Sequence, residues 1–336
     1  MIPHNLPTLG PEEQEAASRV LAGGWIAQGA EVEAFENELC HFLDLPTGHA
    51  VAVSSGSAAL FLALWALNGK DKRVGLPVYS CSALRNAVGL AGATSVYLDC
   101  EWNSVNVDTT AAARSGIDIL IAPSIFGIPA DLPNAREYML IEDLAQSLGA
   151  RVAGKRIGLR GEVGVCSFYA TKLMTTGGQG GSVISRDRAL IDRIRDYREF
   201  DCRDDAKLRF NFQMTDLQAA VGRIQLGRLP GFIERRENWF AMYQEDGLDL
   251  LDYRTPRVEP VRYRIVMRCA QPARIISVLL SAGIRAIVPI DERELLDDSN
   301  RYPVALALAN TTVSLPAYPS LRKDDVARIA SIAKEG

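Results

Sequence analysis

Short apolar segments alternate with helical segments through the first half of the chain, and this alternation constrains the fold more than any other feature. The expected strands are residues 50–53, 73–77, 94–99, 117–122 and 138–142. The intervening sequence fits helices at residues 58–67 and 82–91. Such alternation is typical of a mostly parallel sheet with helices on both faces, which binds ligands at the carboxyl ends of its strands. The sequence therefore predicts an α/β fold.

The rest of the chain predicts further helices and a second, smaller domain. Helices are expected at residues 11–23, 31–43, 189–200, 215–229 and 232–243. Pro230 separates the last two, since proline begins or kinks a helix. The elements expected beyond Gly247 are strands at 263–269 and 285–288, a helix at 273–282 and a terminal helix after residue 323. We therefore expect a large domain at residues 1–247 and a small α+β domain at residues 248–336.

Composition excludes several classes of protein. The 336 residues include 37 basic and 41 acidic ones, mixed along the chain, so we predict no nucleic-acid partner. The apolar runs are far shorter than the roughly 20 residues of a membrane-spanning helix, so no membrane partner is expected. The amino-terminal residues lack the basic and apolar segments of a signal peptide, which predicts a cytoplasmic location.

Cysteine and histidine usage narrows the chemistry further. The six cysteines are scattered without a CxxC pair, which in a cytoplasmic protein indicates reduced thiols. All three histidines lie before residue 50, so a histidine-based metal site or a Ser-His-Asp triad is hard to assemble. We predict no metal.

A turn of small residues at 54–57, with the sequence SSGS, joins the strand at 50–53 to the helix that follows. The free backbone amides and the dipole of a helix N-terminus both favour an anion such as phosphate at this place. The alternative is an ordinary connection in which a serine caps the helix. The segment by itself leaves both interpretations open.

Lys172 and Asp143 are the candidate catalytic residues. Lys172 lies between a short apolar run containing Ser167 and a glycine-rich loop, although most lysines are solvated surface charges. Asp143 follows the strand at 138–142, and facing a pyridinium nitrogen it would stay ionised and keep that nitrogen protonated. Its alternatives are a helix cap or a surface turn. Together the two residues suggest a pyridoxal phosphate site in which Lys172 forms an imine with the cofactor.

Several motifs follow one another along nearly the whole chain. They are LAGGWIAQG from residue 21, AVSSGSAAL from 52, LIEDLAQSLGA from 140, SFYATK from 167, NFQMTDLQAAVGRIQL from 211 and SLPAYPSL from 314. In this order they resemble the DegT/DnrJ/EryC1/StrS family of sugar aminotransferases. The resemblance implies a fold type I pyridoxal phosphate-dependent enzyme, with the cofactor in the large domain.

The resemblance also implies roles for individual residues. Lys172 would carry the cofactor, Asp143 would pair with the pyridine nitrogen, and Gln146 would approach the ring hydroxyl. The residues that would hold the phosphate are Gly56, Ser57 and Ser167. Asn211, in the NFQM segment, would reach the phosphate of a neighbouring subunit, which implies a homodimer with a shared active site.

The chain departs from the family pattern near the expected substrate. Cys81 stands where relatives usually carry an aromatic residue over the cofactor ring, so either its thiol packs on the ring or Tyr79 takes that place. Gln213 replaces a common arginine. The glycine loop is one residue longer than usual, with Gln179 near the position of a common glutamate. We expect these changes to affect the substrate more than the cofactor.

The function implied is transfer of an amino group from glutamate or glutamine to a keto sugar, nucleotide-linked in the usual case, or to a similar keto substrate. One alternative is an enzyme that uses the same cofactor for a step other than transamination. Another is a non-catalytic regulatory or binding protein that kept the fold. The presence of Lys172 together with Asp143 disfavours the binding protein, because a binding module has no need of both.

Overall fold

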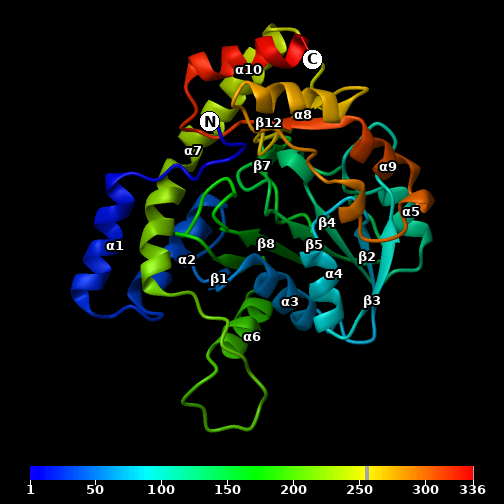
Figure 1. The fold of residues 1–336 in the computed structure, drawn as a ribbon. Helices are drawn as coiled ribbons and strands as arrows, with labels where there is room; N and C mark the ends of the chain where they lie inside the picture. The colour runs from blue at the N-terminus through cyan, green and yellow to red at the C-terminus, as the bar shows by residue number, and fades with distance from the viewer. Residues whose placement is uncertain (254–256, 336) are drawn as a thin grey trace.

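The computed structural model describes residues 1–253 and 257–335, and a seven-stranded sheet forms its centre (Figure 1). In spatial order the strands are β1 (Ala50–Val53), β9 (Gly181–Ile184), β8 (Val163–Ser167), β5 (Met139–Asp143), β4 (Ile119–Pro123), β2 (Arg73–Pro77) and β3 (Thr94–Leu98). Strand β9 runs antiparallel to both of its neighbours, and the other adjacent pairs are parallel. The predicted α/β fold with a mostly parallel sheet is confirmed.

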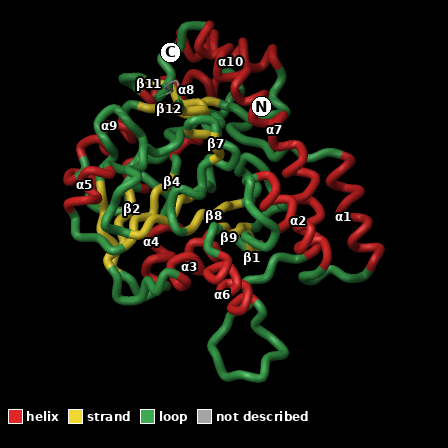
Figure 2. Tube along the Cα trace, turned by 180° about the vertical axis from the view of Figure 1, so that it is seen from behind, coloured by secondary structure: helices red, strands yellow, loops and turns green. Residues whose placement is uncertain are grey.

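Helices cover both faces of this sheet (Figures 1 and 2). The helices of the described chain are α1 (Pro11–Gly23), α2 (Ala30–Phe42), α3 (Gly56–Ala66), α4 (Ala83–Leu90), α5 (Thr109–Arg114), α6 (Arg188–Arg198), α7 (Asp216–Glu245), α8 (Pro272–Ser281), α9 (Pro303–Asn310) and α10 (Lys323–Glu335), of which α8 and α10 lie on the smaller C-terminal sheet instead. Successive side chains of a strand point to opposite faces. Accordingly, Val51 and Val53 pack with α3, α4 and α6, whereas Ala50 and Ala52 pack with α2 and α7.

Helix α7 corrects one prediction. The two helices expected on either side of Pro230 form a single helix, with the proline inside it. Proline removes one backbone hydrogen bond, but Pro230 is exposed and buried side chains on both sides anchor the helix. Leu229 packs in the core beneath the large sheet, and Trp239 packs in the core of the C-terminal part. Packing at both ends therefore outweighs the local cost of the proline.

The C-terminal part contains a second, smaller sheet. Strands β11 (Ile265–Arg268) and β12 (Thr312–Leu315) pair antiparallel and pack against α8, α10 and the end of α7. The predicted strand at 285–288 is wrong, because Ile287 forms only an isolated bridge with Ser314. Pro289, two residues later, has no N–H to continue a ladder.

Short strands and mixed packing link the two parts of the chain. Strand β6 (Arg151–Val152) pairs with β7 (Lys155–Arg156) on one side and with β10 (Val258–Glu259) on the other. Val266 of β11 belongs to the core of the large sheet. The boundary at residue 247 stays a prediction. Among the described residues, no helix combines the length and the apolar character needed to cross a bilayer.

The register of the parallel strands brings several chain segments to one level. Pro123 at the end of β4 is paired with Asp143 at the end of β5, which is paired with Val165 of β8. Helix α3 begins beside the end of β8, since Gly56 lies against Ser167. These strand ends form the floor of the candidate active site.

Candidate active site

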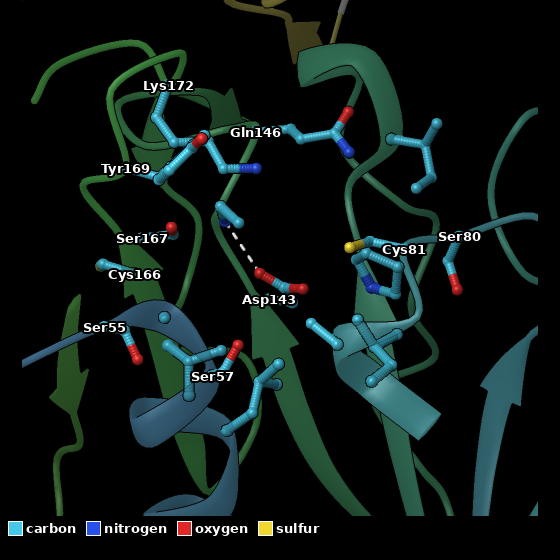
Figure 3. A pocket seen from close by; sticks show the side chains of 18 of the residues that line it. Ser55, Ser57, Ser80, Cys81, Asp143, Gln146, Cys166, Ser167, Tyr169 and Lys172 are labelled. Atoms are coloured by element: carbon cyan, nitrogen blue, oxygen red, sulfur yellow. Dashed lines mark hydrogen bonds between the residues drawn. The ribbon is translucent and has the colours of Figure 1, made fainter. Parts of the chain in front are cut away.

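A pocket of about 210 Å³ lies at the carboxyl ends of the parallel strands (Figure 3). The predicted site residues that line it are Gly56, Ser57, Cys81, Asp143, Gln146, Ser167 and Lys172. They come from segments more than 100 residues apart in sequence, and the fold brings them together. Asn211 does not line this pocket; it is exposed, in the segment between α6 and α7.

One end of the pocket is the N-terminus of α3. Ser55 is the N-cap, and its Oγ accepts a hydrogen bond from the amide of Ala58 at 3.1 Å. The amides of the first helical turn have no partners within the helix and are available to an anion. The capping serine and the anion site, which were alternatives in the sequence, are therefore compatible here.

Gly56 and Ser167 fit together so closely that only glycine is accommodated. A Cβ at position 56 would lie 2.7 Å from the Cβ of Ser167 and 2.8 Å from its Oγ. The contact places the Ser167 hydroxyl beside the first turn of α3, where Ser57 also lines the pocket. Two hydroxyls and free helix amides thus surround one small space, which suits a phosphate group.

Asp143 forms the floor of the pocket and is only 6% exposed. Its Oδ1 accepts a hydrogen bond from the amide of Ala145 at 2.8 Å (Figure 3). Burial raises the pKa of Asp143, while the Ala145 amide and the positive charge of Lys172 act in the opposite direction. A carboxylate in this position is stabilised by a further cation, and a protonated ring nitrogen provides one.

Gln146 is held by a turn that follows β4. Its Oε1 accepts a hydrogen bond from the amide of Phe126 at 2.7 Å. Because a backbone amide can only donate, this bond fixes the orientation of the side-chain amide and leaves its NH₂ group as a donor toward the pocket. Phe126 has a φ of 58°, a left-handed conformation that is uncommon for a non-glycine residue. The turn is thus a specific local structure beside the pocket.

Lys172 lies in a short turn after β8. Its amide donates to the carbonyl of Tyr169 at 2.9 Å, and the side chain of Asn5 donates to the carbonyl of Thr171 at 2.9 Å. The Lys172 ammonium nitrogen lies 5.4 Å from the ring centroid of Tyr263. Burial acts to raise the pKa of Tyr263, but the positive charges of Lys172, Arg264 and Arg236, together with a hydrogen bond with Thr171, lower that pKa.

Sequence reasoning did not find Tyr263. It precedes β11 by two residues, and its contact with Lys172 joins positions 91 apart in the chain. No motif in the sequence indicated this pairing. Because Tyr263 is buried, its burial alone would suggest an ordinary core residue.

The structure also shows where residues that depart from the family pattern lie. Cys81 is exposed and lines the pocket, whereas Tyr79 is fully buried and packs edge-on against Phe126. This arrangement favours the Cys81 thiol, and not Tyr79, as the group beside the cofactor ring. Gln179 lines the pocket as well, after Gly177 and Gly178, which both have positive φ.

The chemistry of these side chains fits pyridoxal phosphate. The pocket has an anion site at the start of α3, a buried carboxylate at its floor, a fixed amide donor and a lysine. These groups match a phosphate, a ring nitrogen, a ring hydroxyl and an aldehyde, respectively. In the described part of the chain, no cluster of His, Cys, Asp and Glu is suited to a metal ion.

Comparison with known proteins decides the family. The sequence profile of the DegT/DnrJ/EryC1/StrS aminotransferase family matches residues 7–334. The chain belongs to this family. Its cofactor is pyridoxal phosphate, so the chain is a pyridoxal phosphate-dependent aminotransferase. The family, the fold, the enzyme class and the cofactor predicted from the sequence are confirmed.

Individual relatives cover almost the full chain. The dTDP-3-amino-3,4,6-trideoxy-alpha-D-glucose transaminase of Streptomyces venezuelae is 30% identical over 97% of this chain and 92% of its own length. The erythromycin biosynthesis sensory transduction protein EryC1 of Saccharopolyspora erythraea is 30% identical over 96% of this chain and 94% of its own. The crystal structure of S. venezuelae DesV superposes with a TM-score of 0.88 at 29% identity, covering 96% and 94% of the two chains.

Replacement of Gly56 tests the anion site. We expect Gly56→Ala to weaken binding of pyridoxal phosphate about ten- to hundredfold, since overpacking typically costs about 1–3 kcal/mol. The measurement is a titration of cofactor-free protein followed by visible absorbance. Gly227→Ala on α7 is the matched control, because no atom lies within 4 Å of the added methyl group. Unchanged affinity in Gly56→Ala would show that the contact with Ser167 does not shape the site.

Proposed function

We propose that this enzyme transfers an amino group from glutamate or glutamine to a keto sugar that is linked to a nucleotide. The observation that carries the proposal is the presence of Lys172 and Asp143 in one pocket, beside the N-terminus of α3. The name of the S. venezuelae relative, a transaminase of a dTDP-linked sugar, supports the nucleotide-linked acceptor. The reduced cysteines support a cytoplasmic enzyme.

In this proposal, each side chain of the pocket has a different role. Pyridoxal phosphate, when bound, supplies an electron sink for the α-carbon of the amino donor. Asp143 would keep the ring nitrogen protonated, and the NH₂ group of Gln146 would donate to the ring hydroxyl. The first amides of α3 and the hydroxyls of Ser57 and Ser167 would hold the phosphate.

Lys172 is the proton carrier. Once the amino donor has displaced it, its neutral amine takes a proton from the donor's α-carbon as a general base. As the resulting ammonium group, it returns a proton as a general acid within the same pocket. In the second half of the reaction the amine performs these transfers in reverse on the keto sugar.

A second copy of the chain completes the site in this proposal. Asn211 is exposed, and the segment that contains it projects from the body of the molecule below α6 (Figures 1 and 2). The same segment carries two large exposed apolar side chains, Leu208 and Phe210, which are 84% and 60% exposed. Exposed apolar groups of this size favour burial against a protein partner. We propose a homodimer in which Asn211 of each copy reaches the phosphate in the other.

The cofactor spectrum tests the reaction. Wild-type protein loaded with pyridoxal phosphate should have a visible band from the lysine-bound cofactor, and glutamate or glutamine should bleach it. Lys172→Ala should lack the band, whereas Lys155→Ala, at an exposed position on β7, should retain it. A wild-type band that no amino donor bleaches would contradict transamination and favour another reaction of the same cofactor.

Subunit mixing tests the shared site. Lys172→Ala and Asn211→Ala variants should each have low activity alone. In a random mixture, half of the dimers are mixed, and each mixed dimer has one pocket with both wild-type residues, so about a quarter of wild-type activity should return. Wild-type protein and each variant, assayed separately at equal concentration, give the full and the background activity for comparison. No recovery, or an active monomer in sedimentation, would argue against a site built from two copies.

A further inference from the structure

The peptide unit that joins Thr171 to Lys172 is hydrogen-bonded at both of its polar atoms. The Lys172 amide donates to the carbonyl of Tyr169 at 2.9 Å, and the Thr171 carbonyl accepts from the side-chain amide of Asn5 at 2.9 Å. A peptide unit is planar and includes the Cα atom of the residue that follows, which here is Lys172. The two hydrogen bonds therefore fix the point from which the Lys172 side chain begins.

Asn5 is the partner that comes from outside this turn, 166 positions away from Thr171 in the sequence. A carbonyl oxygen can only accept a hydrogen bond, so the NH₂ group of Asn5 faces Thr171. The bond from Lys172 to Tyr169 lies within the turn and moves with it. The bond from Asn5 instead ties the turn to another part of the chain, and so it contributes to where the turn lies.

The residues before Asn5 are fastened to the C-terminal part. The amide of Ile2 donates to the carbonyl of Gly283 at 2.8 Å. A ring nitrogen of His4 is hydrogen-bonded to the hydroxyl of Ser314 in β12 at 2.9 Å. The amino-terminal segment is therefore attached to the smaller sheet immediately before it reaches the Lys172 turn.

The residues after Asn5 are held by helix α7 and by the chain that leads to α10. The side-chain amide of Gln225, a buried residue of α7, donates to the carbonyl of Thr8 at 2.9 Å. The hydroxyl of Thr8 donates to the hydroxyl of Ser320 at 3.2 Å. Because the segment is anchored before and after Asn5, the Asn5 side chain holds the turn in place and does not simply follow it.

The placement of the turn matters because of the proposed role of Lys172 as the proton carrier. A general base transfers a proton when the two heavy atoms are about 2.6–3.2 Å apart. A misplacement of about 1 Å can reduce a rate about 100-fold. The lysine side chain is a flexible four-carbon stem. A fixed starting point therefore narrows the positions that the Lys172 amine can reach.

We propose that Asn5 is a positioning residue, which holds the Lys172 turn where the Lys172 amine reaches the α-carbon of the amino donor. Asn5 does not line the pocket. It acts through the Thr171 carbonyl, and the amino-terminal segment links the position of the turn to the C-terminal part. The inference rests on the proposed transamination, in which Lys172 carries the proton.

Hydrogen exchange of the cofactor-free protein, measured at single residues, tests the structural part of this inference. In Asn5→Ala, the Lys172 amide should exchange about two- to tenfold faster than in wild type, the effect of losing one hydrogen bond. Thr8→Ala is the matched control, because it removes a hydrogen bond of the same segment away from the Lys172 turn. Asn5→His keeps an N–H group at a similar reach and should restore part of the protection.

The holoenzyme separates proton transfer from displacement of the lysine. In Asn5→Ala, bleaching by saturating glutamate or glutamine should be about tenfold slower, with a similar half-maximal concentration. Deuterium at the α-carbon of the donor should slow the variant more than wild type, because proton transfer then limits the rate. Methoxyamine forms a C=N bond to the cofactor and releases Lys172 as a free amine without taking a proton from carbon. Its rate should be as in wild type.

Each of three results would overturn the inference. Unchanged exchange of the Lys172 amide in Asn5→Ala means that the turn is held without Asn5. Faster exchange with unchanged bleaching means that the position of the turn does not govern proton transfer. Equal slowing with the amino donor and with methoxyamine, at an unchanged isotope effect, means that Asn5 has a structural role only.

Failure of the proposed transamination gives a different result. Wild-type holoenzyme would then resist bleaching by both glutamate and glutamine. The exchange rate of the Lys172 amide would still depend on Asn5, because that measurement needs neither cofactor nor substrate.

Discussion

A buried carboxylate at the end of a parallel strand is the constraint on which this active site depends. Asp143 is almost fully enclosed, and burial raises its pKa because the charged form loses its hydration. The Ala145 amide and the nearby Lys172 offset part of that cost. The remaining cost would be offset by a cofactor that brings a positive charge to this place, as a protonated pyridine ring does.

The parallel sheet supplies the geometry that surrounds this carboxylate. Strands β4, β5 and β8 end at one level, so the phosphate end of the pocket, its floor and the lysine-bearing turn lie close together without long loops. The C-terminal part packs beside the lysine-bearing turn. The turn at Ile125–Gly127 accepts backbone hydrogen bonds from Val261 and Arg264, and Tyr263 between them lies beside Lys172.

Much of the fold could be predicted from the sequence, because its strands and helices have local signals. The strand at 50–53 and the helix at 11–23 were predicted with the observed bounds, and the motifs around Asp143 and Lys172 identified the pocket. The predictions were wrong where contacts between segments far apart in the sequence determine the local structure. Helix α7 continues through Pro230 because two separate cores hold it, and the segment at 285–288 lacks a continuous partner. Tyr263 had no local signal as a site residue, since its partner Lys172 lies in another segment.

Thermal unfolding of Asp143→Asn, with and without pyridoxal phosphate, tests the central claim most directly. Asparagine keeps an acceptor for the Ala145 amide but cannot ionise. Since the pKa of Asp143 is raised in the folded cofactor-free protein, ionisation at pH 8 opposes folding, and stability contributed by the protonated form is lost as pH rises through that pKa. We expect the cofactor-free variant to melt at the same or a higher temperature than wild type, while the stabilisation by pyridoxal phosphate is largely lost. A variant that is destabilised without cofactor and retains the full stabilisation with it would contradict the account.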